Sequence, residues 1–181
     1  DGLNRFDGQN FRVFKNLPGD STSLQENYVM SLKESSKGEL WIGTWGAGLQ
    51  KYIPETESFL SYRMENSHDG FVQCLMEDSN GTIWFGTTTG GLFNFDPSTE
   101  IFKNYVKGRS GFPSINITCI VEDHHGHLWI GTWDDGLIKF EPESGKSEHF
   151  EYRAGMPGTI SSNGVWDIHI EHNGSLLLST F

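Results

Sequence analysis

A Trp-x-Gly-Thr tetrapeptide that recurs along the chain places the strongest constraint on its fold. Its tryptophans are Trp41, Trp84 and Trp129, separated by 43 and 45 residues. A glycine stands three residues before each tryptophan, and a Gly-Leu pair follows each tetrapeptide. Leu177 takes the place of the tryptophan in a fourth, degenerate copy. A regular period of about 40–50 residues is typical of repeat architectures. The fold can therefore be predicted from the strands of a single repeat.

Each repeat predicts four short strands, A to D. Strand A is an apolar segment that starts near residues 29, 72, 117 and 165, and strand B contains the Trp-x-Gly-Thr tetrapeptide. Strand C starts at the Gly-Leu pair, and strand D follows a turn rich in Pro, Ser, Thr and Glu. Short strands separated by turn residues indicate antiparallel meanders, and four strands per repeat of this length are the signature of a β-propeller. We therefore expect an all-β propeller of about four blades.

The repeat pattern also predicts how the chain is divided. We expect a half blade at 1–22, repeats at 23–66, 67–111 and 112–160, and a second half blade at 161–181. The two halves could close on each other into a four-bladed ring. We favour a partial arc of a larger ring, because the chain starts within a repeat. An open arc leaves blade faces uncovered, which favours association, for example as a homodimer.

Composition excludes several classes of partner. The formal net charge of −11 argues against a general affinity for nucleic acid or anionic membranes. No apolar run approaches the roughly 20 residues of a membrane-spanning helix, so we expect no membrane insertion by this segment. Cys74 and Cys119 fall at matching places on strand A of consecutive repeats, where we expect buried thiols and no disulfide.

The recurring tryptophans are expected to serve the fold. Side chains alternate between the faces of a strand, so Trp41 and Gly43 share one face and Ile42 and Thr44 the other. A large ring beside a missing side chain is how facing blades could interlock, with the glycine making room. The predicted structural positions are Trp41, Trp84, Trp129, Gly43, Gly86 and Gly131.

The repeat consensus resembles the two-component regulator propeller repeat, most clearly at 72–97 and 117–142. In that family such repeats build seven-bladed propellers in the periplasmic sensor region of bacterial hybrid two-component histidine kinases, many of which detect oligosaccharides. The resemblance therefore implies a periplasmic ectodomain of an inner-membrane protein, an oligosaccharide ligand, and further blades and sensor-kinase regions as partners. Leu177 in place of tryptophan, an eroded first repeat and a blade count below seven depart from the pattern.

The position after Gly-Thr differs between repeats and lies at the mouth of the B–C turn. In propellers these turns open on the same face as the D–A connections, which is the usual ligand face. Exposed aromatic rings beside carboxylates and amides are typical of sugar binding. The alternatives are that these rings cover the ends of adjacent blades and that the aspartates are turn formers. The ligand-binding candidates are Trp45, Thr88, Thr89, Arg109, Phe112, Trp133, Asp134 and Asp135.

No catalytic, metal or cofactor site is predicted. The three histidines of the 124–127 segment fall in an A–B turn without a further ligand at suitable spacing. The pairs Glu77-Asp78 and Glu122-Asp123 recur at one repeat position, which favours turn and capping roles. We therefore expect a non-enzymatic sensor segment. The alternatives are a lyase-like propeller enzyme, for which His169 and His172 are weak candidates, and a purely structural dimerisation scaffold.

Overall fold

The described residues of this computed structural model are 1–64, 70–105 and 112–181, and they form sixteen strands and no helix. Three antiparallel sheets have four strands each, in the order A-B-C-D. Their strands are β3 (Val29–Glu34), β4 (Leu40–Thr44), β5 (Leu49–Ile53) and β6 (Ser58–Tyr62), then β7 (Val72–Glu77), β8 (Ile83–Thr87), β9 (Leu92–Asp96) and β10 (Ile101–Tyr105), and finally β11 (Ile117–Glu122), β12 (Leu128–Thr132), β13 (Leu137–Glu141) and β14 (Lys146–Phe150).

Two further sheets have two strands each. The first, β1 (Leu3–Phe6) with β2 (Phe11–Phe14), corresponds to strands C and D. The second, β15 (Val165–Ile170) with β16 (Leu176–Thr180), corresponds to strands A and B. The prediction of an all-β fold built from four-stranded antiparallel blades is confirmed. The predicted repeat limits at 66 and 111 lie outside the described residues.

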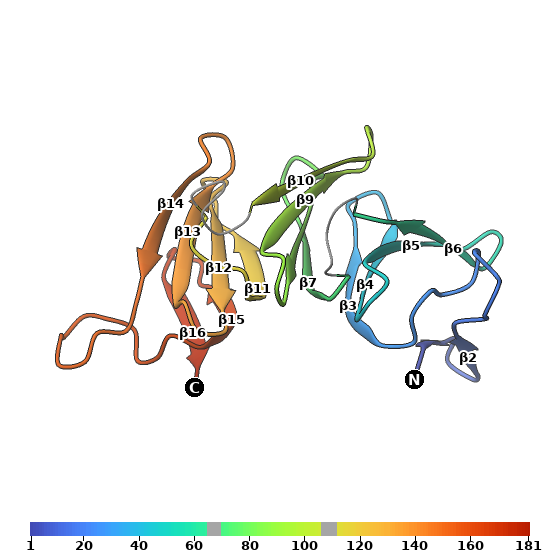
Figure 1. The fold of residues 1–181 in the computed structure, drawn as a ribbon, viewed down its shortest axis with the longest axis horizontal. Coiled ribbons are helices and arrows are strands. Elements are labelled where there is room, and N and C mark those ends of the chain that lie inside the picture. Colours follow the sequence, from blue (N-terminus) through green and yellow to red (C-terminus); the bar gives the residue numbers. More distant parts are fainter. Residues whose placement is uncertain (65–69, 106–111) are drawn as a thin grey trace.

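The sheets follow one another in chain order as a row, from β2 at one end to β15 and β16 at the other (Figure 1). Strands A of consecutive sheets contact one another, β3 with β7, β7 with β11 and β11 with β15, so they form the inner side of the arc. Each strand A has a register shift at the same place, for example between Val72 and Cys74, and such bulges increase local twist. The two ends of the row are not joined (Figure 1).

The tryptophans of strand B fill the spaces between consecutive sheets. Trp84 is 1% exposed and packs against Tyr105 of its own sheet and Phe140 of the next, with ring centroids 5.7 and 6.0 Å apart. Trp41 is likewise fully buried, between Tyr62 and Phe95. Both rings thus lie buried between sheets, at the positions for which the sequence predicts a structural role.

Trp129 differs from the other two tryptophans because it is only half-buried. Its ring packs against Phe150 of the same sheet, with centroids 5.7 Å apart. In the part of the chain that the structure describes, the neighbouring sheet consists of β15 and β16, so Trp129 has no partner there from a strand C, which supplies the aromatic partner to Trp41 and Trp84. This difference in neighbours explains its greater exposure.

The prediction for the glycines two residues after each tryptophan needs correction in one respect. Gly43 and Gly86 make room not for a tryptophan ring but for the first side chain of strand A in the next sheet, whereas a Cβ on Gly131 would meet Cys119, Thr118 and the backbone oxygen of Val165. A Cβ atom on Gly43 would lie 2.6 Å from Val72 Cγ1, and one on Gly86 would lie 2.5 Å from Ile117 Cβ. The interlocking was predicted, but its partner was wrong, because strand A crosses close to strand B of the preceding sheet.

The recurring carboxylates stabilise turns and join sheets. Asp78 Oδ2 accepts a hydrogen bond of 2.7 Å from the Trp84 indole, and its Oδ1 accepts bonds from two backbone N–H groups of the A–B turn. Asp123 does the same for Trp129. Burial would raise the pKa of Asp123, but hydrogen bonds from Trp129 and from the backbone of His127 and His125 outweigh it and lower the pKa to about 2.

The glutamates before these aspartates reach across to the preceding sheet. Glu77 accepts hydrogen bonds of 2.6 and 2.8 Å from the backbone N–H and the hydroxyl of Ser36. Glu122 makes the matching pair of bonds with Ser79, at 2.7 and 2.8 Å. The aspartates thus have the turn role expected from the sequence, whereas the glutamates join consecutive sheets, a role that the sequence did not predict.

The sheet of β3 to β6 lacks this aspartate, because Ser35 occupies the position equivalent to Asp78. Trp41 Nε1 is buried without a hydrogen-bond partner. We expect Ser35→Asp to raise the free energy of unfolding by about 1 kcal/mol, since the carboxylate would accept the indole hydrogen bond. Denaturant titration measures the change, and Asp78→Ser, which removes the equivalent bond, is expected to lower stability. A Ser35→Asp protein less stable than the parent would contradict this account.

Candidate ligand face at the B–C turns

The threonine of each Trp-x-Gly-Thr tetrapeptide builds the B–C turn. Thr44, Thr87 and Thr132 are fully buried. Their hydroxyls donate hydrogen bonds to the carbonyls of Gly48, Gly91 and Gly136, at 3.0, 3.1 and 2.7 Å respectively. These acceptor glycines have φ angles of 76°, 83° and 82°, a region that favours glycine. The recurrence of the threonine beside the glycine is visible in the sequence, but its role in the turn is not.

Each turn is fixed between two D–A connections. The backbone N–H of Trp45 donates to Tyr28 O, in the connection before its own sheet, at 2.8 Å. The N–H of Gly46 donates to Gly70 O, in the connection before the next sheet, at 2.9 Å. The B–C turns and the D–A connections therefore share one face, which we call the turn face.

Three aromatic side chains gather at the C-terminal end of the turn face. Trp133, Trp166 and Phe181 are 47, 37 and 68% exposed. Their ring centroids are 4.6 to 5.7 Å apart, and each pair is edge-on. Asp134 follows Trp133 and is exposed. This group, named the aromatic cluster from here on, combines exposed π-faces with a hydrogen-bond acceptor.

A second aromatic pair lies nearer the N-terminal end of the same face. Trp45 is 40% exposed, and its ring is 4.8 Å from that of Phe71. A pocket of about 420 Å³ adjoins the same turn, lined by Gln25, Gly46, Ser61, Arg63 and Met64 among others. The turn face thus carries two separate groups of exposed rings.

The remaining candidates divide into three kinds. Thr88 is half-buried and Thr89 exposed, in the turn between the two aromatic groups. Asp135 is half-buried and its N–H donates to Thr132 Oγ1 at 3.0 Å, so its position serves the turn. Phe112 is 2% exposed and packs against Phe140, so it has no surface for a ligand and is excluded. Arg109 lies outside the described residues.

The sequence predicted no role for Trp166. It precedes Asp167 at the start of strand A, and the other repeats have no aromatic residue at this place. The equivalence of Phe181 with Trp45 and Trp133 was visible in the repeat alignment. The approach of Trp166 to both rings depends on the local twist at the β15 register shift, which no sequence pattern gives.

Other reactive side chains lie away from the turn face or within the core. Cys74 and Cys119 are free, and burial raises the pKa of Cys119 to about 11 and also raises that of Cys74. His127 Nδ1 lies 3.2 Å from Asp123 Oδ2, in an A–B turn at the opposite end of the sheet. Within residues 1–64, 70–105 and 112–181, no group of three or more His, Cys, Asp or Glu side chains could hold a metal ion.

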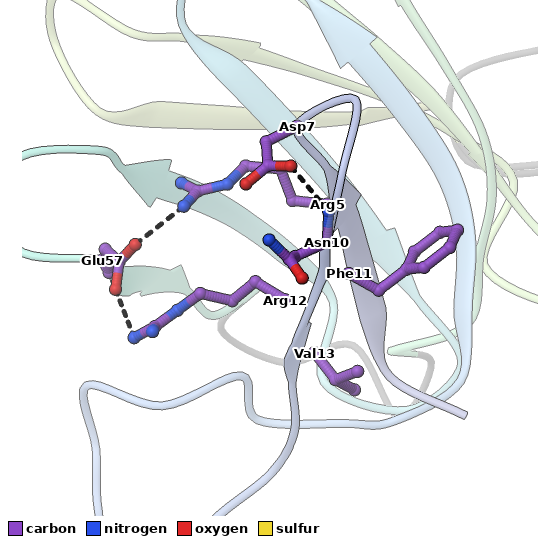
Figure 2. Close-up of a pocket in the computed structure, with 7 residues that line it drawn as sticks. All are labelled: Arg5, Asp7, Asn10, Phe11, Arg12, Val13 and Glu57. Carbon is purple, nitrogen blue, oxygen red and sulfur yellow. Dashed lines mark hydrogen bonds and ion pairs between the residues drawn. The ribbon is translucent and has the colours of Figure 1, made fainter.

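A pocket at the outer rim is lined by the β1–β2 hairpin and by Glu57. Figure 2 shows Arg5 and Arg12 both reaching Glu57. Arg5 also donates to the Tyr52 hydroxyl at 3.0 Å. Both guanidinium groups are already paired with the Glu57 carboxylate, and these ion pairs join the hairpin to the next sheet. The pocket is therefore a poor candidate for ligand binding.

A profile of the two component regulator propeller matches three segments, 23–46, 66–89 and 111–134. Each of these three segments is similar to one repeat of that family. In the described residues, each matched segment covers strands A and B and continues into the B–C turn. No curated protein sequence matches the chain at a significant level. Across the described residues, no helix has the length and apolarity required to cross a membrane.

Solved structures with similar folds include extracellular domains of two putative hybrid two component systems from B. thetaiotaomicron. The first has a TM-score of 0.84 at 22% identity and the second 0.79 at 24%, each over 99% of this chain. The chain spans about a quarter of their length, 24 and 23%. Virginiamycin B lyase from Staphylococcus aureus is also similar, with a TM-score of 0.69 at 18% identity over 91% of this chain and 51% of the lyase. At these identities the similarity shows the propeller fold alone.

Proposed function

We propose that this chain is part of the extracellular, periplasmic sensor region of a hybrid two-component system and that it binds an oligosaccharide on the turn face. The aromatic cluster is the observation that carries the proposal. Three large rings that remain 37 to 68% exposed leave π-faces available to the C–H faces of sugar rings. The repeats and the similar extracellular domains support the sensor role.

The polar groups around the cluster suit a sugar ligand. Asp134 offers carboxylate oxygens that accept hydrogen bonds from hydroxyl groups. Thr88 and Thr89 lie between the aromatic cluster and the Trp45–Phe71 pair, where they can contact the middle of an extended ligand. The net charge of −11 disfavours polyanionic glycans, so the proposed ligand is a neutral oligosaccharide.

Binding at the turn face offers a route to a signal. The turn of one sheet is hydrogen-bonded to the connection before the next, as Gly136 N–H is to Asn163 O at 2.8 Å. A ligand that contacts a turn therefore also acts on the junction between two sheets. Transmission requires that the ligand bind one arrangement of the sensor more tightly than another. The kinase that receives the signal would lie in another part of the protein.

Calorimetric titration of the 181-residue chain with a panel of neutral oligosaccharides tests this proposal. Trp133→Ala is expected to weaken binding about tenfold or more, because it removes one of the three rings of the aromatic cluster. Phe11→Ala is the matched control, because Phe11 is an aromatic residue 70% exposed on the outer hairpin. Equal affinity of the parent and Trp133→Ala for every bound oligosaccharide would contradict the proposal.

The two alternatives have less support. His169 is exposed on β15, and His172 lies in the A–B turn at the opposite end of the sheet from the turn face, so neither residue joins the aromatic cluster. Fold similarity to a lyase is not evidence of its chemistry. A purely structural scaffold would not require three exposed rings to gather beside a carboxylate, so we retain the binding role.

A further inference from the structure

The pocket beside the B–C turn of the β3 to β6 sheet shares no lining residue with the aromatic cluster. Its volume is about 420 Å³, and its lining includes Gln25, Gly46, Ser61, Arg63, Met64 and Gly70. This volume lies within the range of about 300–1,000 Å³ that is typical of small-molecule sites. Trp45 precedes Gly46 and Phe71 follows Gly70, so the Trp45–Phe71 ring pair adjoins this pocket. We call it the glutamine pocket.

Behind this pocket, strand C carries a buried polar residue at a position that is apolar in the other two complete sheets. Gln50 is equivalent to Phe93 and Ile138, because each of the three pairs with the third residue of its strand B. Their exposed fractions are 0, 2 and 0%. Burial of an amide is unfavourable unless its hydrogen bonds are satisfied, so packing alone does not explain a glutamine here.

Only one end of the Gln50 amide is used by the described part of the chain. Its Oε1 accepts a hydrogen bond of 3.2 Å from the backbone N–H of Gln25. Its Nε2 is buried and has no hydrogen-bond partner among the described residues. A buried donor without an acceptor costs free energy, so a ligand that supplies an acceptor would gain affinity at this atom.

Two lining residues connect Gln50 to the glutamine pocket. The first is Gln25, whose N–H it bonds, and the second is Ser61, which lies opposite Gln50 in the pairing of β5 with β6. The Gln25 side chain is held in place because its Nε2 donates to the carbonyls of Asp20 and Ser23, at 3.0 and 2.7 Å. A ligand hydroxyl that enters between Gln25 and Ser61 would therefore reach the unpartnered amide.

We propose that the glutamine pocket is a subsite for one sugar residue of the neutral oligosaccharide, an inference that rests on the binding function proposed above. A sugar hydroxyl both donates and accepts hydrogen bonds, and the pocket offers both kinds of partner. Gln50 Nε2 and the Arg63 guanidinium are donors, and Gln25 Oε1 is an acceptor. Glu26 Oε2, which would lie 3.7 Å from a Cβ on Gly46, is a further acceptor and disfavours an anionic sugar.

The two groups on the turn face would have different roles in recognition. Stacking on the aromatic cluster depends mainly on the C–H face of a sugar ring, whereas a hydrogen bond from a fixed amide depends on where a hydroxyl lies. A site built to bond a hydroxyl rejects an analogue that lacks it, because its own polar groups are then left unpaired. The glutamine pocket therefore determines which sugar is selected.

Calorimetric titration of Gln50→Leu with each oligosaccharide that binds the parent chain tests the proposal. Leucine matches the apolar residues of the other sheets and removes the unpartnered donor. We therefore expect a denaturation midpoint equal to or above that of the parent, with affinity lowered about fivefold or more. Gln9→Leu is the matched control, because it makes the same change at an exposed position of the outer hairpin. Unchanged affinity of Gln50→Leu would overturn the proposal.

The side-chain NH₂ resonances of Gln50 report the contact directly, and their loss in Gln50→Leu assigns them. A bound oligosaccharide is expected to shift them, because the amide gains an acceptor. Backbone shifts at 133–135 without a shift of the Gln50 amide would overturn the subsite and leave the proposed function standing. If no oligosaccharide binds the parent chain, the proposed function itself fails, and the subsite fails with it.

Discussion

Trp84→Ala is expected to lower the free energy of unfolding by about 3–5 kcal/mol, the cost typical of deleting a fully buried tryptophan. The ring is 1% exposed and lies between Tyr105 and Phe140, so the substitution leaves a cavity between two sheets. It also removes the indole donor from Asp78. Chemical denaturation followed by circular dichroism measures the change.

Trp129→Ala is the matched comparison for this prediction. Trp129 occupies the same repeat position but is half-buried and has one aromatic neighbour, Phe150. The chain should therefore lose only about 1–2 kcal/mol, in proportion to the smaller area that is removed from water. Equal losses for the two substitutions would show that the junction between sheets does not stabilise Trp84.

Gly86→Ala should be the most damaging single-methyl addition among the strand B glycines, with an expected cost of about 2–3 kcal/mol. The added Cβ would lie 2.5 Å from Ile117 Cβ and 2.9 Å from Cys74 Sγ. Ile117 Cβ is not the end of a flexible side chain, so strand A of the next sheet must move. Thermal and denaturant unfolding both report the loss.

Gly38→Ala separates this clash from the general cost of replacing a glycine. Gly38 has a φ of 77° in an A–B turn, and no atom lies within 4 Å of the added Cβ. Its substitution should cost about 1 kcal/mol, from backbone conformation alone. If Gly86→Ala were the milder of the two, the close approach of consecutive sheets would be contradicted.

Repetition explains why so much of the fold could be predicted from the sequence. The same flanking glycines recur around Trp41, Trp84 and Trp129. Because the pattern is repeated three times, a chance arrangement of residues does not explain it. Strand alternation then assigned Trp41 and Ile42 to opposite faces, as their different core clusters confirm.

The partners across sheets were harder to predict. The glycine beside each tryptophan indicated a close approach, but not that Val72 or Ile117 would make it. The bond from Ser36 to Glu77 spans 41 positions and depends on how two sheets are stacked. Such contacts follow from the angle between blades, which a strand pattern does not contain.

The candidate site was predicted less completely than the fold. Trp133 and Asp134 were singled out because the repeats differ there, and both are exposed on the turn face. Phe112 was included because it belongs to a D–A connection, yet it is buried beside Phe140. Position in a connection does not distinguish a residue that anchors the loop from one that the loop presents.

Backbone amide NMR of the chain with a bound oligosaccharide tests the central claim most directly, because it locates the ligand without any substitution. The account predicts chemical-shift changes at the turn face, above all at 133–135 and 164–166 and at the C-terminal Phe181, with none at the A–B turns 35–38, 78–81 and 123–126. Shifts confined to the A–B turns, or to the outer hairpin that carries Arg5 and Arg12, would contradict it.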